Sequence, residues 1–143
     1  MQRIMGFAVA VALVLGLSGE VGAAGYKVVV NKDNPAPGLV RQKVAFMFMG
    51  MTAKWEHGVA VAAIDQLPGA AVRVAFTREI HNRDVADIQT AWQRAVFSGR
   101  GEPPPEAASD ADVLSYVASH PGGIGYVSEA AATDGVKVLG VLR

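Results

Sequence analysis

Apolar positions along the chain change their spacing several times, and each change predicts a different element. Residues 26–30 form a β-branched run that the turn-forming residues 31–38 end, which predicts a strand followed by a loop. Apolar residues within 39–49 recur at helical spacing and predict a short helix. The run 59–64 is short, apolar and β-capable, so we expect a buried strand there, broken by the turn formers of residues 65–69.

The second half of the chain alternates helical patterns with short apolar runs. Helices are predicted from about residue 71 to 80, from the cap Asp84 to residue 97, and from a cap at Ser109 or Asp110 to His120. The proline-containing stretch 98–105 is predicted to be an extended loop, and strands are predicted at 124–127 and 136–142. Strands separated by helices predict an α/β domain with a mixed or parallel sheet covered by helices.

The first 24 residues have the pattern of a cleavable secretory signal. A positive charge at Arg3 precedes an apolar stretch at 4–17, and small residues follow at 21–24. About 14 apolar residues are too few for a membrane-spanning helix, which needs about 20. We therefore expect cleavage after Ala23 or Ala24, a single mature domain of residues 25–143, and a periplasmic or secreted location. No later run is long enough to predict a membrane span.

Composition excludes several classes of function. The 13 basic and 13 acidic residues balance, so no broad basic surface is available and no nucleic-acid partner is expected. The chain has no cysteine, which excludes disulfides and a cysteine nucleophile. Its three histidines lack the spacing of metal ligands, and its serines lie in no nucleophile elbow. We expect no catalytic residue, no metal and no cofactor, so the protein is predicted not to be an enzyme.

Four stretches, taken together, resemble one family. They are Val29 to Pro35 (VVNKDNP), Phe48 to Gly58 with its Lys54-Trp55 and His57-Gly58 pairs, Trp92 to Pro104, and Gly122 to Val127 (GGIGYV). The first, second and fourth are similar to segments of PstS-like phosphate ABC transporter substrate-binding proteins, and the stretch from Trp92 to Pro104 resembles the small, single-lobed members of this group. The resemblance implies a single lobe of the type 2 periplasmic-binding-protein-like fold, matching mainly the second of two lobes, and phosphate or another small oxyanion as ligand. A ligand held by one lobe stays partly solvated, which weakens its charged hydrogen bonds.

The resemblance also places a candidate anion site. The family has an arginine and, a few residues later, Ser-Gly-Thr at a helix N-terminus, where N–H groups and the helix dipole hold an oxyanion. Aligned on Gly69, this chain has a glutamine at the arginine position and Ala-Ala-Val in place of Ser-Gly-Thr. The candidate anion-binding residues are therefore Gln66, Gly69, Ala70, Ala71, Val72 and Arg73. From residue type alone, we expect the Arg73 side chain to be solvated on the helix surface. We expect Gln66 to lie in a loop.

Two functions follow from these patterns. One is an exported, non-catalytic binding-protein-like domain whose oxyanion site is degraded or altered. The other is a periplasmic interaction or dimerisation module that has lost ligand binding and docks a partner protein or a second copy through its apolar cleft. The large aromatic residues Trp55, Trp92 and Tyr126 lie in apolar contexts and are expected to pack in the core rather than to stack on a ligand.

Overall fold

A four-stranded mixed sheet forms the centre of the computed structural model, which describes residues 25–143. The predicted signal sequence, residues 1–24, lies outside the described residues. The strand order is β3-β6-β1-β7, with bounds β1 Tyr26–Val30, β3 Ala62–Ala63, β6 Gly123–Ser128 and β7 Lys137–Val138. Strand β6 is antiparallel to β1 and parallel to β3, and β7 is antiparallel to β1.

Two short parallel strand pairs and the helices surround this sheet. The pairs are β2 (Gly38–Val40) with β8 (Gly140–Leu142), and β4 (Asp65–Gln66) with β5 (Glu106–Ala107). The helices are α1 (Arg41–Phe48), α2 (Ala71–Phe76), which continues into the π-helical turn η1 (Thr77–His81), α3 (Val85–Phe97) and α4 (Asp110–Ser119). None of the helices within residues 25–143 has the length and apolarity needed to span a bilayer.

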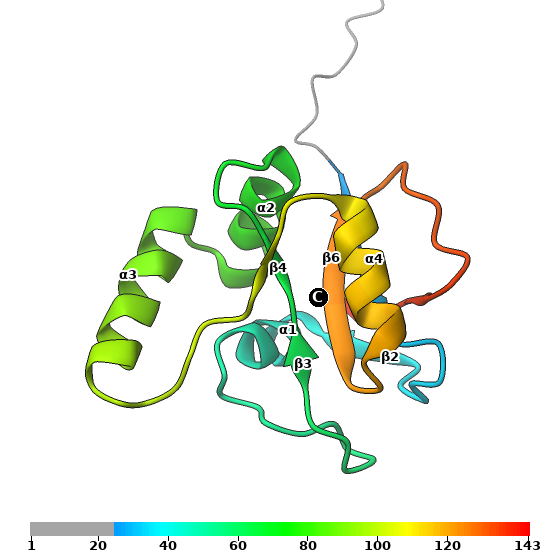
Figure 1. The fold of residues 1–143 in the computed structure, drawn as a ribbon, viewed down its shortest axis with the longest axis horizontal. Coiled ribbons are helices and arrows are strands. Elements are labelled where there is room, and N and C mark those ends of the chain that lie inside the picture. The colour runs from blue at the N-terminus through cyan, green and yellow to red at the C-terminus, as the bar shows by residue number, and fades with distance from the viewer. Residues whose placement is uncertain (1–24) are drawn as a thin grey trace, which may run out of the picture.

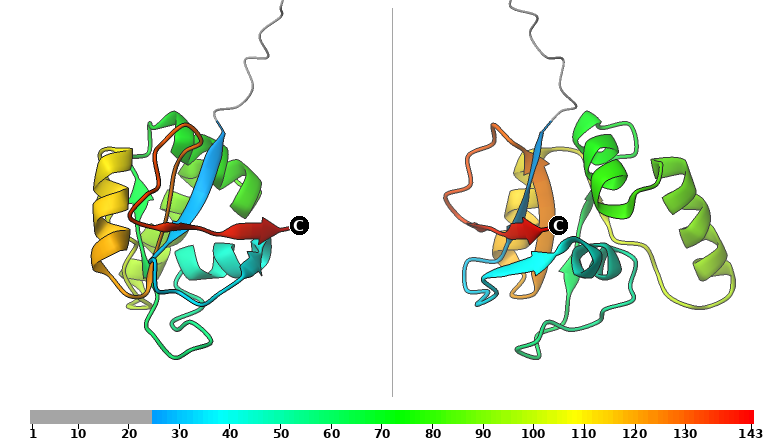
Figure 2. Two further views of the ribbon diagram at one scale, coloured as in Figure 1. Left: turned by 90° about the vertical axis from the view of Figure 1, so that its right-hand side faces the viewer. Right: turned by 180° about the vertical axis from the view of Figure 1, so that it is seen from behind.

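The sheet is covered on both faces because its central strands alternate their buried side chains. In β1, Val28 and Val30 pack in the cluster that includes α1 and α2, whereas Val29 packs in the cluster that includes α4. Figure 2 shows α4 on one side of β1 and β6 and α1 and α2 on the other. The domain therefore has three layers, helix, sheet and helices, as the sequence pattern predicts.

An aromatic stack fills the layer between the sheet and α2. The rings of Phe76 and Tyr126 lie 3.9 Å apart between centroids and almost parallel, and Phe48 lies 4.8 Å from Phe76. All three side chains are fully buried. We call Phe48, Phe76 and Tyr126 the aromatic core. Burying rings of this size supplies much of the apolar area on which a cysteine-free domain depends.

Helix α3 lies apart from this core. In Figure 1 it is at the left of the molecule, beyond β4, and the chain returns from it through an extended segment to α4. Only Ile88 and Trp92 of α3 are buried, while Val96 is half exposed and Phe97 is 95% exposed. The helix is thus held against the body by two large side chains.

The predicted elements are largely confirmed, with four corrections. The predicted strand at 136–142 is divided at Leu139 into β7 and β8, which belong to different sheets. The predicted helix at 39–49 begins only at Arg41, because Gly38–Val40 pairs with β8 as β2. The predicted strand at 59–64 is limited to Ala62–Ala63. Residues 65 and 66, predicted to break that strand, form β4, and its partner β5 follows the predicted extended loop. Parallel pairing between residues some 40 positions apart supports β4 and β5, and local sequence patterns do not report such pairing.

Candidate functional site

Two helices begin at one edge of the molecule, immediately after a pair of parallel strands. Strand β4 leads into α2 and strand β5 leads into α4. The carboxylate of Asp110, the first residue of α4, accepts hydrogen bonds from Gln66 Nε2 at 2.8 Å and from the Ser128 N–H at 3.1 Å. These bonds tie the start of α4 to the ends of β4 and β6. We call this region the carboxyl edge, the usual place for ligands in α/β proteins with parallel strands.

The N-terminus of α2 presents uncapped backbone groups at this edge. Ala70 is in the extended conformation of an N-cap residue, but no side chain accepts a hydrogen bond from the first turn. A turn closed by the hydrogen bond from the Ala70 N–H to the Leu67 carbonyl, 2.9 Å, leads into the helix. Gly69 and Ala71 are exposed and Val72 is buried. The first N–H groups of a helix have no intrahelical acceptor, so they are available to a ligand or to water.

Arg73 is buried rather than solvated, which corrects the expectation from residue type. Its Nη1 donates to the Gln66 carbonyl at 2.8 Å and forms an ion pair with Glu106. Its Nε lies 3.9 Å from Asp65 Oδ1. The guanidinium is therefore already compensated by two carboxylates of the neighbouring strands. Its charge is directed toward β4 and β5.

Gln66 is also buried, within β4, and not in a loop as expected. Its Nε2 donates both to Asp110 and to the Tyr126 carbonyl, and its N–H donates to the Tyr126 hydroxyl at 3.0 Å. Gln66 thus uses its side-chain amide and its backbone N–H in hydrogen bonds within the carboxyl edge. Of the six candidate residues, Gly69, Ala70 and Ala71 are the ones at the surface.

Burial and hydrogen bonds shift the pKa values of the ionisable groups at this edge. Burial raises the pKa of Asp65, although Arg73 and the hydrogen bond from the Tyr126 hydroxyl, 2.7 Å long, oppose that change. Burial and the neighbouring Asp65 raise the pKa of Tyr126, so its hydroxyl remains a donor. Burial disfavours ionisation of Asp110, but hydrogen bonds from Gln66 and Ser128 outweigh it and lower its pKa. Arg73 therefore lies between the carboxyl groups of Asp65 and Glu106, and its ion pair with Glu106 already uses its charge.

Two cavities adjoin the carboxyl edge. The larger, about 800 Å³, lies between the start of β1, α2 and the C-terminal strands, with Ala71 in its wall. The smaller, about 420 Å³, lies between α3 and the β4–β5 pair, and Asp65, Arg73 and Glu106 contribute to its wall. The sequence predicts that Trp55, Trp92 and Tyr126 are packing residues, and their burial confirms this. Within residues 25–143 no three His, Asp or Glu side chains are grouped so that they could hold a metal ion.

Sequence reasoning missed the acidic side of this region. Asp65, Glu106 and Asp110 come from three segments that only the tertiary structure brings together. The available signal was the Asp65-Gln66 pair directly after an apolar run, because polar residues at the end of a buried strand often form a site.

Comparison with known proteins identifies the fold. No family model matches the chain, and no curated protein matches it. An ABC-type phosphate transport receptor from Vibrio cholerae superposes with a TM-score of 0.66 and 18% identity, covering 82% of this chain and 46% of that structure. A putative phosphate ABC transporter substrate-binding protein with bound phosphate from Clostridium perfringens has a TM-score of 0.63 and 18% identity, over 82% of this chain and 44% of that one.

A third solved structure agrees with the first two. PstS from Borrelia burgdorferi superposes with a TM-score of 0.56 and 10% identity, covering 81% of this chain and 46% of its own. The chain thus spans slightly less than half the length of each of these proteins. The predicted fold, a single lobe of the PstS-like periplasmic-binding-protein type, is confirmed. At these identities the likeness concerns the fold alone.

Proposed function

We propose that the mature chain is an exported, non-catalytic binding lobe related to the substrate-binding proteins of phosphate ABC transporters, with an altered oxyanion site. The observation that carries this proposal is the exposed, uncapped N-terminus of α2 at the carboxyl edge, in a lobe that superposes on phosphate transport proteins over 82% of its length. Backbone N–H groups and the helix dipole favour an anion at such a terminus. The ligand is a small oxyanion such as phosphate.

Three features of the site support weak binding. Ala70, Ala71 and Val72 carry no hydroxyl group, so the ligand is left with the backbone donors. Arg73 is paired with Glu106 and offers no free charge. An anion on a single lobe also keeps part of its hydration, which reduces the strength of each hydrogen bond. We expect a dissociation constant in the millimolar range, unless another protein or a second copy supplies a second wall.

Thermal unfolding of the mature protein in phosphate, sulfate and chloride tests the proposal. A ligand at ten times its dissociation constant stabilises the native state by about 1.4 kcal/mol. This corresponds to a rise in Tm of a few degrees for a domain of this size. Phosphate should give a saturable rise that chloride at equal ionic strength does not give.

A gain-of-function variant makes the test sharper. The triple substitution Ala70→Ser, Ala71→Gly and Val72→Thr restores the hydroxyls of the family pattern and should tighten phosphate binding about tenfold or more, as two added hydrogen bonds to an anion imply. Ala118→Ser adds a hydroxyl at an exposed position of α4 and is the matched control. The absence of any phosphate-specific rise in both the native chain and the triple variant would contradict an anion site here.

Export is tested separately from binding. Expression of the full chain should yield a protein in the periplasm or medium whose N-terminal sequence begins at Ala24 or Gly25. A product that keeps Met1 in the membrane fraction would contradict the export proposal and leave the binding test unaffected.

A further inference from the structure

The cavity of about 800 Å³ beside α2 adjoins a second one of about 400 Å³. Arg78 and Glu79 belong to the walls of both, so the two spaces meet at these residues. The larger cavity lies between the start of β1, α2 and the C-terminal strands, which lie next to one another in both views of Figure 2. We call it the α2 groove. We call the smaller one the arginine pocket, because Arg41, Arg78 and Arg143 line it.

The α2 groove offers accessible apolar surface on both of its walls. Ala71, Val74 and Ala75 lie on one face of α2, and Arg78 continues that face one turn later. From Ala71 to Arg78 the helix rises about 10 Å. Val74 is 37% exposed, and Val138 of β7 in the facing wall is 47% exposed. A ligand of the usual size for such a volume would therefore find apolar contact on two sides.

Positive charge is in excess in the arginine pocket. Its three guanidinium groups come from the start of α1, from η1 and from the residue after β8, which are Arg41, Arg78 and Arg143. Glu79 Oε1 lies 3.3 Å from Arg143 Nη2. Asp84 Oδ1 lies 3.9 Å from Arg78 Nη2. Three cations thus face two carboxylates, in a chain whose acidic and basic residues balance overall.

The rest of the α2 groove has no such excess. Lys27 and Glu129 contribute one charge of each sign to its walls, and neither lines the arginine pocket. The Lys27 Nζ donates to the Ala131 carbonyl at 2.6 Å. The charges therefore favour one orientation of a ligand, with an anionic group at the arginines and an apolar part along α2.

These cations can be reached from solvent. The side chains of Arg78 and Arg143 are 72% and 87% exposed. Guanidinium groups bind carboxylate and phosphate oxygens through paired hydrogen bonds. An exposed ion pair contributes little by itself, so apolar contact has to supply a large part of the affinity. An anion without an apolar part would bind poorly here.

We propose that the α2 groove and the arginine pocket together bind a small amphiphilic anion, an alkyl chain that ends in a carboxylate or another oxyanion. The anionic group lies between Arg78 and Arg143, and the alkyl chain packs against Val74 and Val138. This site does not depend on phosphate binding at the start of α2, because its charged group is held by arginine side chains and not by the first N–H groups of the helix.

The test is a titration of the ¹⁵N-labelled mature protein with octanoate at pH 7 and constant ionic strength. The backbone N–H resonances of Val74 and Val138 should move in a saturable way, with a dissociation constant in the millimolar range for a ligand of about ten heavy atoms. The resonance of Val96, on α3, should stay in place. Octyltrimethylammonium has the same chain and the opposite charge and should bind about fivefold more weakly or worse. Acetate, the head group alone, should give no saturable change up to 50 mM.

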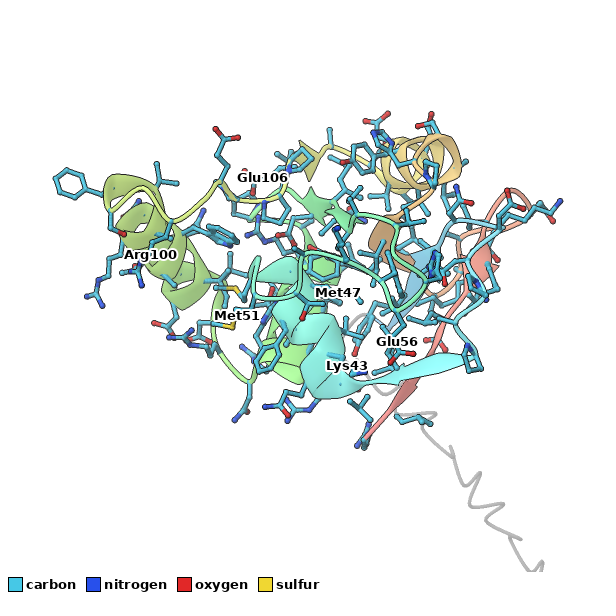
Figure 3. The ribbon with its side chains drawn as sticks, turned by 90° about the horizontal axis from the view of Figure 1, so that it is seen from below. Lys43, Met47, Met51, Glu56, Arg100 and Glu106 are labelled. Carbon is cyan, nitrogen blue, oxygen red and sulfur yellow. The ribbon has the colours of Figure 1, made fainter. Side chains whose placement is uncertain are left out.

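A charge variant tests the arginine pocket. Arg78→Gln together with Arg143→Gln should weaken octanoate binding about fivefold, as two exposed ion pairs imply, and should not weaken binding of octyltrimethylammonium. Arg100→Gln is the matched control. Figure 3 shows Arg100 beside α3, away from the C-terminal strand, and this exposed arginine lines neither cavity.

An apolar variant tests the α2 groove. Val74→Thr replaces a methyl group by a hydroxyl at nearly unchanged helix propensity and should weaken both octyl ligands about threefold, measured at the Val138 resonance. Val96→Thr makes the same change at a half-exposed position of α3 and should alter neither affinity.

Three results would overturn the proposal. The first is the absence of a saturable change at Val74 and Val138 up to 50 mM octanoate. The second is equal affinity for octanoate and octyltrimethylammonium, or full octanoate affinity in the double arginine variant. The third is a dimer in sedimentation whose dissociation on dilution moves the same two resonances, since a second copy would then occupy the groove. All the substituted side chains are exposed, and the comparison of ligands on the native chain decides without any variant.

Discussion

The aromatic core differs from the cavity between α3 and the β4–β5 pair, the α3 cavity, in how completely the groups are partnered. In the aromatic core, Phe76 touches the rings of both Phe48 and Tyr126, and the Tyr126 hydroxyl donates to Asp65. At the α3 cavity, by contrast, lie two of the three buried side-chain nitrogens that lack a partner among the described residues. Well-partnered groups stabilise the fold, whereas a buried donor without a partner costs free energy. The aromatic core is therefore expected to contribute more to stability than the contacts of α3 with the rest of the domain.

The largest expected effect is the loss of stability when a phenylalanine is replaced by alanine. Phe76→Ala removes a fully buried ring from the aromatic core and should lower the free energy of unfolding by about 4 kcal/mol. Phe97→Ala removes a ring that is 95% exposed and should change the free energy of unfolding by less than about 0.5 kcal/mol. Urea unfolding followed by circular dichroism measures both values.

Equal losses for the two variants would break the comparison, because they would mean that α3 is part of the same cooperative packing as the sheet. Loss of more than about 1 kcal/mol on Phe97→Ala would have the same meaning. A change in the urea dependence alone would report on the unfolded state instead.

A smaller loss of stability is expected when the pH is lowered. His81 packs edge-on against Phe76, and burial, together with the charges of Arg83 and Arg73, lowers its pKa to about 4. The unfolded chain binds a proton near pH 6.5 but the native state does not, so stability falls as the pH decreases from 6.5 to 4. The loss of stability is at most about 3.4 kcal/mol, reached below pH 4, and it is absent well above pH 6.5.

The measurement is the difference in unfolding free energy between pH 7 and pH 4.5. His81→Gln should reduce that difference relative to the native chain, because the group that takes up the proton on unfolding is gone. His57→Gln alters an exposed histidine and is the control. If His81→Gln retains the full acid sensitivity, carboxylates alone account for it and the aromatic core tolerates a charged His81.

The parts of the fold that the sequence predicts are those with a local cause. The β-branched residues of β1 favour a strand, and the hydroxyl of Ser109 accepts from the Asp112 N–H to cap α4, as the sequence suggests. Strands β4 and β5 have two residues each and depend on pairing between Asp65 and Glu106, which local periodicity does not contain. The short strands were therefore missed, although the layers were predicted correctly.

The anion site at the start of α2 stays a prediction, while the structure changes what is expected of two of its residues, Gln66 and Arg73. The resemblance placed the start of α2 at a ligand edge, and the structure has an uncapped helix terminus there. The partners of Arg73 could not be predicted, because Glu106 lies 33 residues along the chain from it. Likewise the apolar context of Trp92 predicts its burial, but the lack of an acceptor for its N–H is visible only in the structure.

The smallest expected effect is the difference in stability between variants of the two buried tryptophans. Trp55→Phe removes the hydrogen bond from the indole to Gly122, whereas Trp92→Phe removes an N–H that has no partner. Both substitutions lose similar ring volume, so Trp55→Phe should cost about 1 kcal/mol more than Trp92→Phe, the net worth of one buried hydrogen bond. Urea midpoints of the two variants measure this difference. If the two costs are equal, the Trp92 indole already has a partner of equal strength, such as an ordered water, and the contrast between the aromatic core and the α3 cavity would then lie in shape alone.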